Sequence, residues 1–232
     1  MKNFYRLKMK YQRYAIRNLA KYMTIIYAIT YLTMVTGIGN FLYWDFLAFS
    51  PAEVMHGQIW RIITAIVYPP FANDGIVMAL LGIYIFYSFS SLVEEVMGEF
   101  EYNLYFFGSF IIGELGAIIL YLLTGINMPF MPIYTQFSVF MAFAVLFPDA
   151  TVLLMFALPI KAKYFALVEL LVYAFQLIRG SLYTKVSIIA AIIPVVLFFV
   201  LMYNRRGGNI INDIKAEIRH KQRQKEWKDQ WK

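Results

Sequence analysis

The sequence predicts an all-α membrane protein whose helices cross the bilayer several times. Of its 232 residues, 61% are hydrophobic and 15% are charged. Soluble domains contain about 25% charged residues. The apolar residues also gather in long runs without charge, as helices that cross a membrane require. These features exclude an ordinary water-soluble enzyme, a disordered chain and a fibrous protein.

Six apolar segments are the expected membrane spans. A helix rises 1.5 Å per residue, so about 20 residues cross a hydrocarbon core of about 30 Å. The six segments are Tyr22–Trp44, Gly75–Val93, Tyr102–Leu123, Met131–Pro148, Tyr164–Ile178 and Val186–Tyr203. The fifth covers only about 22 Å, so Lys161, Lys163 and Arg179 beside it are expected to extend toward the membrane surface.

Two further segments are expected at the membrane surface. Asp45–Asn73 mixes charged and aromatic residues with three prolines. It is too polar to cross the membrane and too apolar for a free loop, so we expect a structured first outside loop. Thr151–Ile160 is apolar but too short to cross, and is expected to rest at the surface between the fourth and fifth spans.

Basic residues are concentrated at the two ends of the chain. Residues 1–22 hold seven Lys or Arg and no acid, and residues 204–232 hold nine more of the 21. The positive-inside rule therefore places both termini in the cytoplasm. We expect a basic amphipathic segment at 1–21, a membrane domain at 22–203 and a basic tail at 204–232. The predicted location is the cell membrane, or the endoplasmic reticulum in a eukaryote.

The expected partner of the basic ends is anionic lipid. Basic ends are also typical of nucleic-acid binding, but the membrane setting favours lipid and no nucleic acid is expected. The chain has no cysteine and only two histidines, His56 and His220. This argues against thiolate or histidine metal sites, and neither a metal nor a cofactor is expected.

Three motifs occur in the order used by the rhomboid-like superfamily. The first is Gly57-Gln58-Ile59-Trp60-Arg61-Ile62-Ile63-Thr64, which is similar to the Trp-Arg loop motif of rhomboids and Derlins. The second is Glu94-Glu95-Val96-Met97-Gly98, where Glu94 and Gly98 match a Glu-x-x-x-Gly turn. The third comprises Phe143–Pro148 and Leu158–Tyr164, which resemble the end of rhomboid span four and the entry to span five. The resemblance implies a rhomboid-like bundle of six transmembrane helices.

Physical chemistry gives the Trp60–Arg61 pair an anchoring role. An indole favours the membrane interface, and a guanidinium binds loop carbonyls or lipid phosphate. Two interpretations remain open: the pair could plug the loop into the bilayer edge, or it could serve function directly.

The residues that rhomboid proteases use for catalysis are missing. The resemblance calls for a Gly-x-Ser-Gly motif in span four and a histidine in span six. Alignment on Phe147-Pro148 puts Ile133 at the serine position, and Val186–Tyr203 contains no histidine. A serine hydroxyl without a base is a poor nucleophile, so Ser138 is not expected to be catalytic. The expectation is a pseudoprotease, with no catalytic residue and no enzyme activity.

Two carboxylates lie within apolar spans. Glu114 is near the middle of the third span, and Glu169 is in the fifth. A charge at this depth costs at least about 2.5–3.5 kcal/mol, so both should face the protein interior or a water-filled depression. In one interpretation they pack the helices together with groups such as Gln136. In the other they line a polar groove that receives a client segment or protons.

The predicted function is to bind or handle the transmembrane segments of client proteins. The first alternative is an active intramembrane serine protease that uses Ser138. The second is a small transporter that uses Glu114 and Glu169, although no inverted repeat is evident. A scaffold whose basic ends recruit lipid or an acidic protein is a further possibility.

Overall fold

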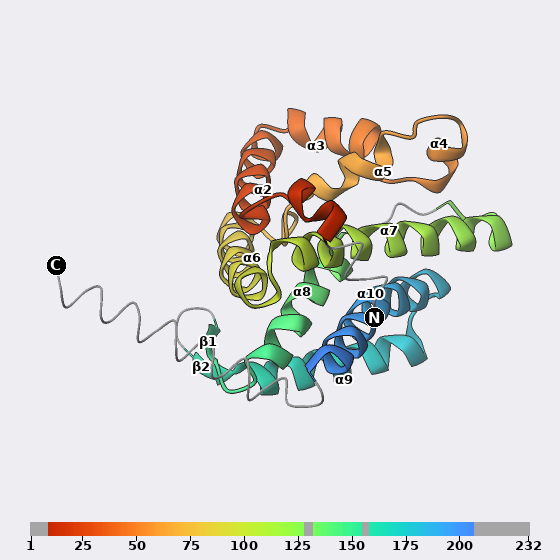
Figure 1. Cartoon of the computed structure of the whole chain (residues 1–232). Helices are drawn as coiled ribbons and strands as arrows, with labels where there is room; N and C mark the ends of the chain where they lie inside the picture. Colours follow the sequence, from red (N-terminus) through yellow and green to blue (C-terminus); the bar gives the residue numbers. More distant parts are fainter. Residues whose placement is uncertain (1–8, 128–131, 155–157, 207–232) are drawn as a thin grey trace. The chain divides into compact units, whose positions relative to one another are not determined.

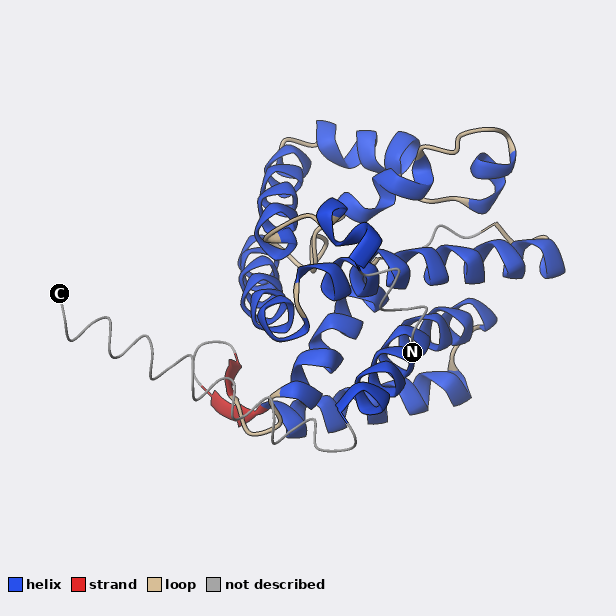
Figure 2. Cartoon of the chain, in the orientation of Figure 1, coloured by secondary structure: helices blue, strands red, loops and turns tan. Residues whose placement is uncertain are grey.

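The computed structural model describes residues 9–127, 132–154 and 158–206, which are mostly helical (Figures 1 and 2). The chain divides into two units, 1–195 and 196–232, and of the second only the end of helix α10 is described. In chain order the elements are η1 (Gln12–Tyr14), α2 (Leu19–Val35), α3 (Ile38–Leu42), η2 (Tyr43–Leu47), α4 (Pro51–Met55), α5 (Arg61–Thr64), η3 (Ala65–Val67), α6 (Ile76–Met97), α7 (Glu99–Thr124), α8 (Ile133–Leu146), β1 (Thr151–Leu154), β2 (Leu158–Lys161), α9 (Ala162–Arg179) and α10 (Leu182–Arg206).

Two helices of the described part are long and apolar enough to cross a membrane. They are α6, of 22 residues, and α7, of 26. They coincide with the second and third segments expected from the sequence. A third crossing is present if α2 and the following α3–η2 segment, which are bent by 114° relative to each other, form one span. Helix α8 lies within the fourth expected segment. Helix α9 includes the fifth, and α10 includes the sixth.

The first expected span is a bent pair of helices, because two glycines break it. Gly37 has a φ of +80°, which favours glycine. Gly39 packs against the end of α2, where an added Cβ would lie 2.4 Å from the carbonyl carbon of Thr33. The lack of a side chain at Gly39 therefore allows α3 to fold back closely onto α2.

Aromatic side chains form the core between α2, α6, α7 and α8. The ring of Tyr27 on α2 meets Phe86 on α6 with centroids 5.0 Å apart. Phe89 on α6 stacks on Phe143 of α8 at 4.2 Å. Tyr27 and Phe106 of α7 are fully buried. Rings of this size bury much apolar area. These aromatic contacts therefore help to hold the four helices together.

The connections around this core are ordered. Residues 45–73 contain the short helices α4, α5 and η3, so the first loop is structured, as expected. The described residues of the apolar stretch at 151–160 form strands. β1 and β2 pair as an antiparallel hairpin, with Val152 opposite Ile160 (Figure 2). A hairpin satisfies backbone polar groups in a segment too short to cross. Next to it, Lys163 Nζ donates to Asp149 at 2.9 Å, which raises the pKa of Lys163.

The ends of the chain are only partly described. A helical turn over residues 9–14 ends at Ala15, which is extended, and α2 already begins at Leu19. Residues 1–8 of the expected amphipathic segment and the tail beyond Arg206 lie outside the described residues.

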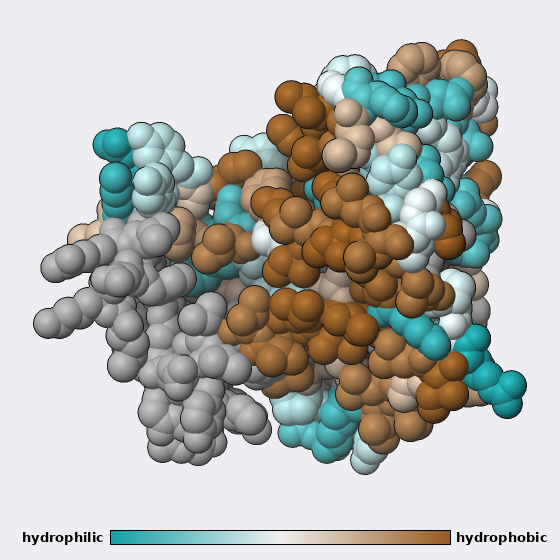
Figure 3. Space-filling model, turned by 90° about the vertical axis from the view of Figure 1, so that its right-hand side faces the viewer, coloured by the Kyte–Doolittle hydropathy of each residue, from teal (hydrophilic) through white to brown (hydrophobic). Residues whose placement is uncertain are grey.

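Large apolar side chains are exposed on several described helices, and Figure 3 shows one face on which they predominate. They lie along the outer faces of the long helices, for example Leu80 on α6, Ile119 on α7 and Leu171 on α9. Soluble proteins rarely expose wide apolar areas. This surface is suited to contact with lipid, and the apolar helices indicate a membrane protein.

The bend between α2 and α3 gives a testable prediction. We expect Gly39→Ala to destabilise the protein by about 1–3 kcal/mol, because the new methyl group overlaps the backbone of Thr33. Denaturant unfolding in detergent micelles measures the change. Gly108→Ala in α7 is the matched control, since an added Cβ there meets nothing within 4 Å. Equal stability of Gly39→Ala and the wild type would refute the close approach.

Candidate functional site

The Trp60–Arg61 motif closes the carboxyl-terminal end of η2. Arg61 Nη1 donates to the Ala48 carbonyl at 2.7 Å, and Nη2 donates to the Asp45 carbonyl. The indole Nε1 of Trp60 donates to the Phe46 carbonyl at 3.1 Å. The hydroxyl of Thr64 donates to the carbonyl of Leu47 at 2.9 Å. Three side chains of one short segment thus satisfy the consecutive carbonyls of residues 45–48.

The end of a helix leaves its last carbonyls without intrahelical partners. A buried polar group that is left unpaired costs about 1–3 kcal/mol. Arg61 is only 4% exposed, and its Nε also donates to Gln58 at 2.7 Å. The geometry therefore assigns a structural role to Arg61, since its guanidinium bonds Asp45, Ala48 and Gln58 within the loop. Trp60 is 48% exposed, which leaves its ring free to contact the interface.

Glu94 caps the amino-terminal end of helix α2. Its two carboxylate oxygens accept from the backbone amides of Leu19 at 2.8 Å and Ala20 at 3.0 Å, at the beginning of α2. Asn18, the residue before α2, provides no side-chain cap. A carboxylate at a helix amino terminus also interacts favourably with the helix dipole. Glu94 therefore attaches the start of α2 to the end of α6.

Gly98 and Asn103 complete this junction. Gly98 has a φ of +92° and forms the turn between α6 and α7. The side chain of Asn103 donates to the carbonyl of Ile16 at 2.9 Å and accepts from its amide at 3.0 Å. The segment leading into α2 is therefore fixed by side chains of both α6 and α7.

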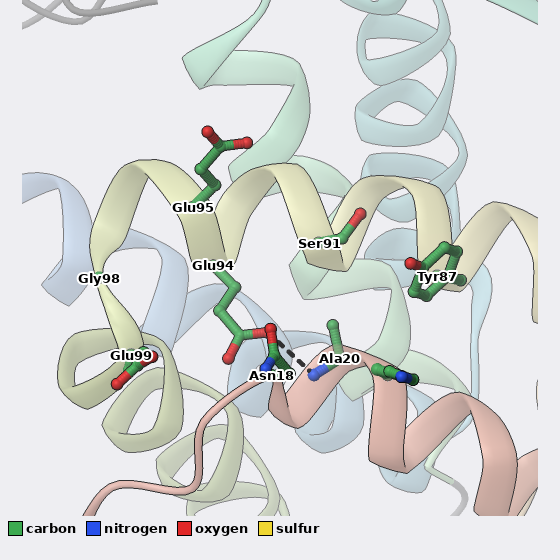
Figure 4. A pocket seen from close by; sticks show the side chains of 9 residues that line it. Asn18, Ala20, Tyr87, Ser91, Glu94, Glu95, Gly98 and Glu99 are labelled. Atoms are coloured by element: carbon green, nitrogen blue, oxygen red, sulfur yellow. Dashed lines mark hydrogen bonds between the residues drawn. The ribbon is translucent and has the colours of Figure 1, made fainter. Parts of the chain in front are cut away.

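A pocket of about 440 Å³ lies at this junction (Figure 4). Glu94 points toward the start of α2, whereas Glu95 points the other way. The volume is within the range of small-molecule sites, but the most buried of its acids, Glu94, is occupied by the two α2 amides. The pocket is lined by Asn18, Ala20, Lys21, Tyr87, Ser91, Glu94, Glu95, Gly98 and Glu99.

The four polar residues expected inside the membrane are all buried. Glu114, Gln136, Ser138 and Glu169 are 3%, 7%, 2% and 8% exposed. Gln136 Nε2 donates to the carbonyl of Tyr68 at 2.8 Å, which ties α8 to the first loop. The hydroxyl of Tyr105 on α7 donates to the carbonyl of Ser138 at 2.7 Å. Gln136 and Ser138 thus contribute contacts between elements.

Buried acceptors without a partner remain among these residues. Oε1 of Gln136, one oxygen of Glu114 and both oxygens of Glu169 have no hydrogen-bond partner within 3.5 Å among the described residues, and the Tyr173 side chain is the neighbour that interacts with Glu169. Buried polar groups in proteins are normally paired, so unpaired buried acceptors are the unusual feature of this interior. They are the best candidates for groups that act on something outside the chain.

Ser138 and His56, the serine and histidine considered for a protease, differ in exposure. Ser138 is buried in α8, whereas His56 is an exposed residue after α4. His220 lies outside the described residues.

Several residues of these contacts were not singled out from the sequence. Thr64 follows Arg61 by three residues, on the same face of a helix, and this spacing was a usable signal. Asn103 and Tyr105 gave no such signal, because their partners Ile16 and Ser138 are 87 and 33 residues away.

The hydrogen bonds of Arg61 to the carbonyls of Asp45 and Ala48 predict that an arginine-to-lysine substitution destabilises the protein more at this position than at an exposed arginine. Arg61→Lys should lower the free energy of unfolding by about 1–3 kcal/mol, because lysine cannot reproduce the guanidinium fork. Arg179→Lys, at an exposed position at the end of α9, should have little effect. Unfolding in micelles and limited proteolysis of residues 45–64 measure both. If the two variants behave alike, Arg61 does not hold the loop.

The Glu94 cap has a control in the adjacent residue. Glu94→Gln keeps the side-chain shape but replaces one of two acceptors by a donor that faces an amide, so we expect a loss of about 1–2 kcal/mol. Glu95→Gln, at an exposed position, leaves the acceptors of the two α2 amides in place. Amide hydrogen exchange at Leu19 and Ala20 should accelerate only in the first variant. Unchanged exchange there would contradict the cap.

Comparisons with known proteins add no relative to these observations. No family model matches the chain, and neither a curated protein nor a solved structure matches it.

Proposed function

We propose that the chain is a six-span, rhomboid-like membrane protein without protease activity, which binds transmembrane segments of other proteins. The order and spacing of its three motifs support the family. Helices are present over all six expected segments, although α6 and α7 alone meet the length and hydropathy of a span as single helices among the described residues. In this proposal both termini are cytoplasmic, and the basic ends contact anionic lipid of the cell membrane.

The observation that carries the proposed function is the set of unpaired carboxylate oxygens on Glu114 and Glu169. Lipid tails offer no hydrogen-bond donor, so a buried acceptor in an apolar helix is costly unless a protein group or water reaches it. A polar side chain on another membrane helix can provide that donor. Hydrogen bonds between helices are a source of association inside membranes, which makes a binder of helices the function that best fits these groups.

The proposed lack of protease activity is argued mainly from the sequence. The aligned serine position is Ile133, and residues 186–203 contain no histidine. In a comparable serine hydrolase, loss of the base costs about a millionfold in rate. Ser138 is also buried within α8, so a substrate would have to displace helix contacts to reach it.

The transporter alternative depends on the same carboxylates. It requires Glu114 and Glu169 to exchange protons or a solute between the two sides of the membrane. Solute uptake into vesicles that is lost in both Glu114→Gln and Glu169→Gln would favour transport over helix binding.

A cleavage and capture assay tests the proposal. The chain is co-expressed with a reporter whose transmembrane helix is loosened by glycine and serine, beside the Ser138→Ala variant. We expect the reporter to co-purify uncleaved with both proteins, because Ser138 takes no part in binding. Cleavage by the wild type that is lost in Ser138→Ala would establish a protease instead. A reporter that is neither cleaved nor captured would contradict both functions.

A further inference from the structure

The pocket at the junction of α2, α6 and α7 brings together accessible groups of both charges. Lys21 of α2 lines it together with Glu95 near the end of α6 and Glu99 at the start of α7 (Figure 4). All three residues are exposed, whereas the carboxylate of Glu94 already accepts from two α2 amides. A ligand in this pocket therefore meets one accessible cation and two accessible carboxylates.

The charged groups of the pocket are open to exchange with a ligand. Among the ion pairs of the described residues, Arg17 Nε lies 3.7 Å from an oxygen of Glu99, with both side chains exposed. An exposed pair at this distance contributes little to stability, so a ligand cation can replace Arg17. Lys21 has no carboxylate within ion-pair distance among the described residues. Its ammonium is therefore accessible to an anionic group.

The pocket lies where a membrane helix ends. Helix α6 has 22 residues and is about 33 Å long, slightly more than the hydrocarbon core of a bilayer. Its last turn, which carries Glu94 and Glu95, therefore reaches the level of the lipid headgroups. Helix α2 begins at Leu19, beside the same pocket, so Lys21 is placed at this level as well.

Exposed apolar or aromatic side chains continue from the pocket along both helices. On α6 they precede Tyr87 at intervals of three and four residues, and on α2 they follow Lys21 at similar intervals. This spacing keeps each row on one side of its helix. Because α2 begins at the pocket and α6 ends there, both rows lead away from it. The rows are Tyr84, Leu80 and Val77 on α6, and Ile25, Ile29 and Leu32 on α2.

We propose that this pocket binds the headgroup of a zwitterionic phospholipid that has a primary amine, phosphatidylethanolamine. The lipid phosphate lies against Lys21, and the ammonium donates hydrogen bonds to Glu95 and Glu99. The acyl chains extend along the apolar rows. The site holds a single lipid and is separate from the general attraction of the basic ends to anionic lipid. It does not depend on the binding of client helices.

The two charges of the pocket select this headgroup against the other common ones. A lipid with a glycerol headgroup offers a phosphate to Lys21 but no cation to the two carboxylates. A choline headgroup is a cation without an N–H group, so it forms no hydrogen bond to Glu95 or Glu99. An ethanolamine headgroup has three N–H donors beside its phosphate, and hydrogen bonds between charged groups are the strong ones.

Native mass spectrometry of the full-length protein in detergent micelles tests the proposal. The probes are dioleoyl phospholipids with ethanolamine, choline or glycerol headgroups, and the readout is the fraction of protein that retains one lipid. We expect the ethanolamine lipid to bind about tenfold more tightly than the other two. Equal retention of the three lipids, or retention of none, would overturn the assignment.

Substitutions separate the phosphate contact from the ammonium contact. Lys21→Gln should weaken binding of all three lipids, because they share the phosphate. Lys10→Gln is the matched control, since Lys10 is exposed and does not line the pocket. Glu95→Gln should reduce the preference for ethanolamine over choline while the α2 cap stays in place. If Lys21→Gln and Lys10→Gln behave alike, or if Glu95→Gln keeps the full preference, the proposed contacts are wrong.

A soluble headgroup distinguishes a lipid from a free metabolite of the same chemistry. Glycerophosphoethanolamine, which lacks acyl chains, should not displace the bound lipid when it is added in excess, because the apolar rows contribute to binding. Complete displacement would overturn the assignment of a lipid and identify a site for a soluble phosphate amine.

Discussion

The structure depends on side chains that cap buried helix ends. A helix that stops at a membrane surface leaves carbonyls or amides unpaired, and this chain pairs them with side chains from distant segments. Arg61, Trp60 and Thr64 satisfy the carbonyls of residues 45–48, and Glu94 satisfies two amides at the start of α2. Residues 57–64 and 94–98, which stood out as motifs in the sequence, thus both help to terminate helices.

The buried polar residues differ in how completely their atoms are paired. Glu94 and Arg61, at helix ends, bond several backbone groups, and Ser138 accepts from Tyr105 through its carbonyl. Gln136 bonds Tyr68 through its nitrogen, but its oxygen, one oxygen of Glu114 and both oxygens of Glu169 have no hydrogen-bond partner among the described residues. Buried polar atoms are normally paired, so these acceptors are the atoms to test for interaction with other molecules.

The sequence predicted much of this fold because hydrophobic runs report directly on membrane helices. It located α6 and α7, a structured segment at 45–73 and buried positions for Glu114 and Glu169. It did not reveal the bend after Val35, because the close approach of Gly39 to Thr33 is a tertiary contact. It also could not identify the partners of Glu94, since Leu19 is 75 residues away. The hairpin at 151–161 was missed because an apolar run too short to cross does not itself specify backbone pairing.

The central claim is that the chain binds membrane-spanning helices of other proteins. Photocrosslinking in native membranes tests it most directly, with a photoreactive residue at Phe175 of α9 or, as a control, at Leu80 of α6, which is similarly exposed at 57%. We expect position 175 to crosslink to membrane-spanning peptides of other proteins, and position 80 to crosslink to lipid. Lipid adducts alone at both positions would contradict the account.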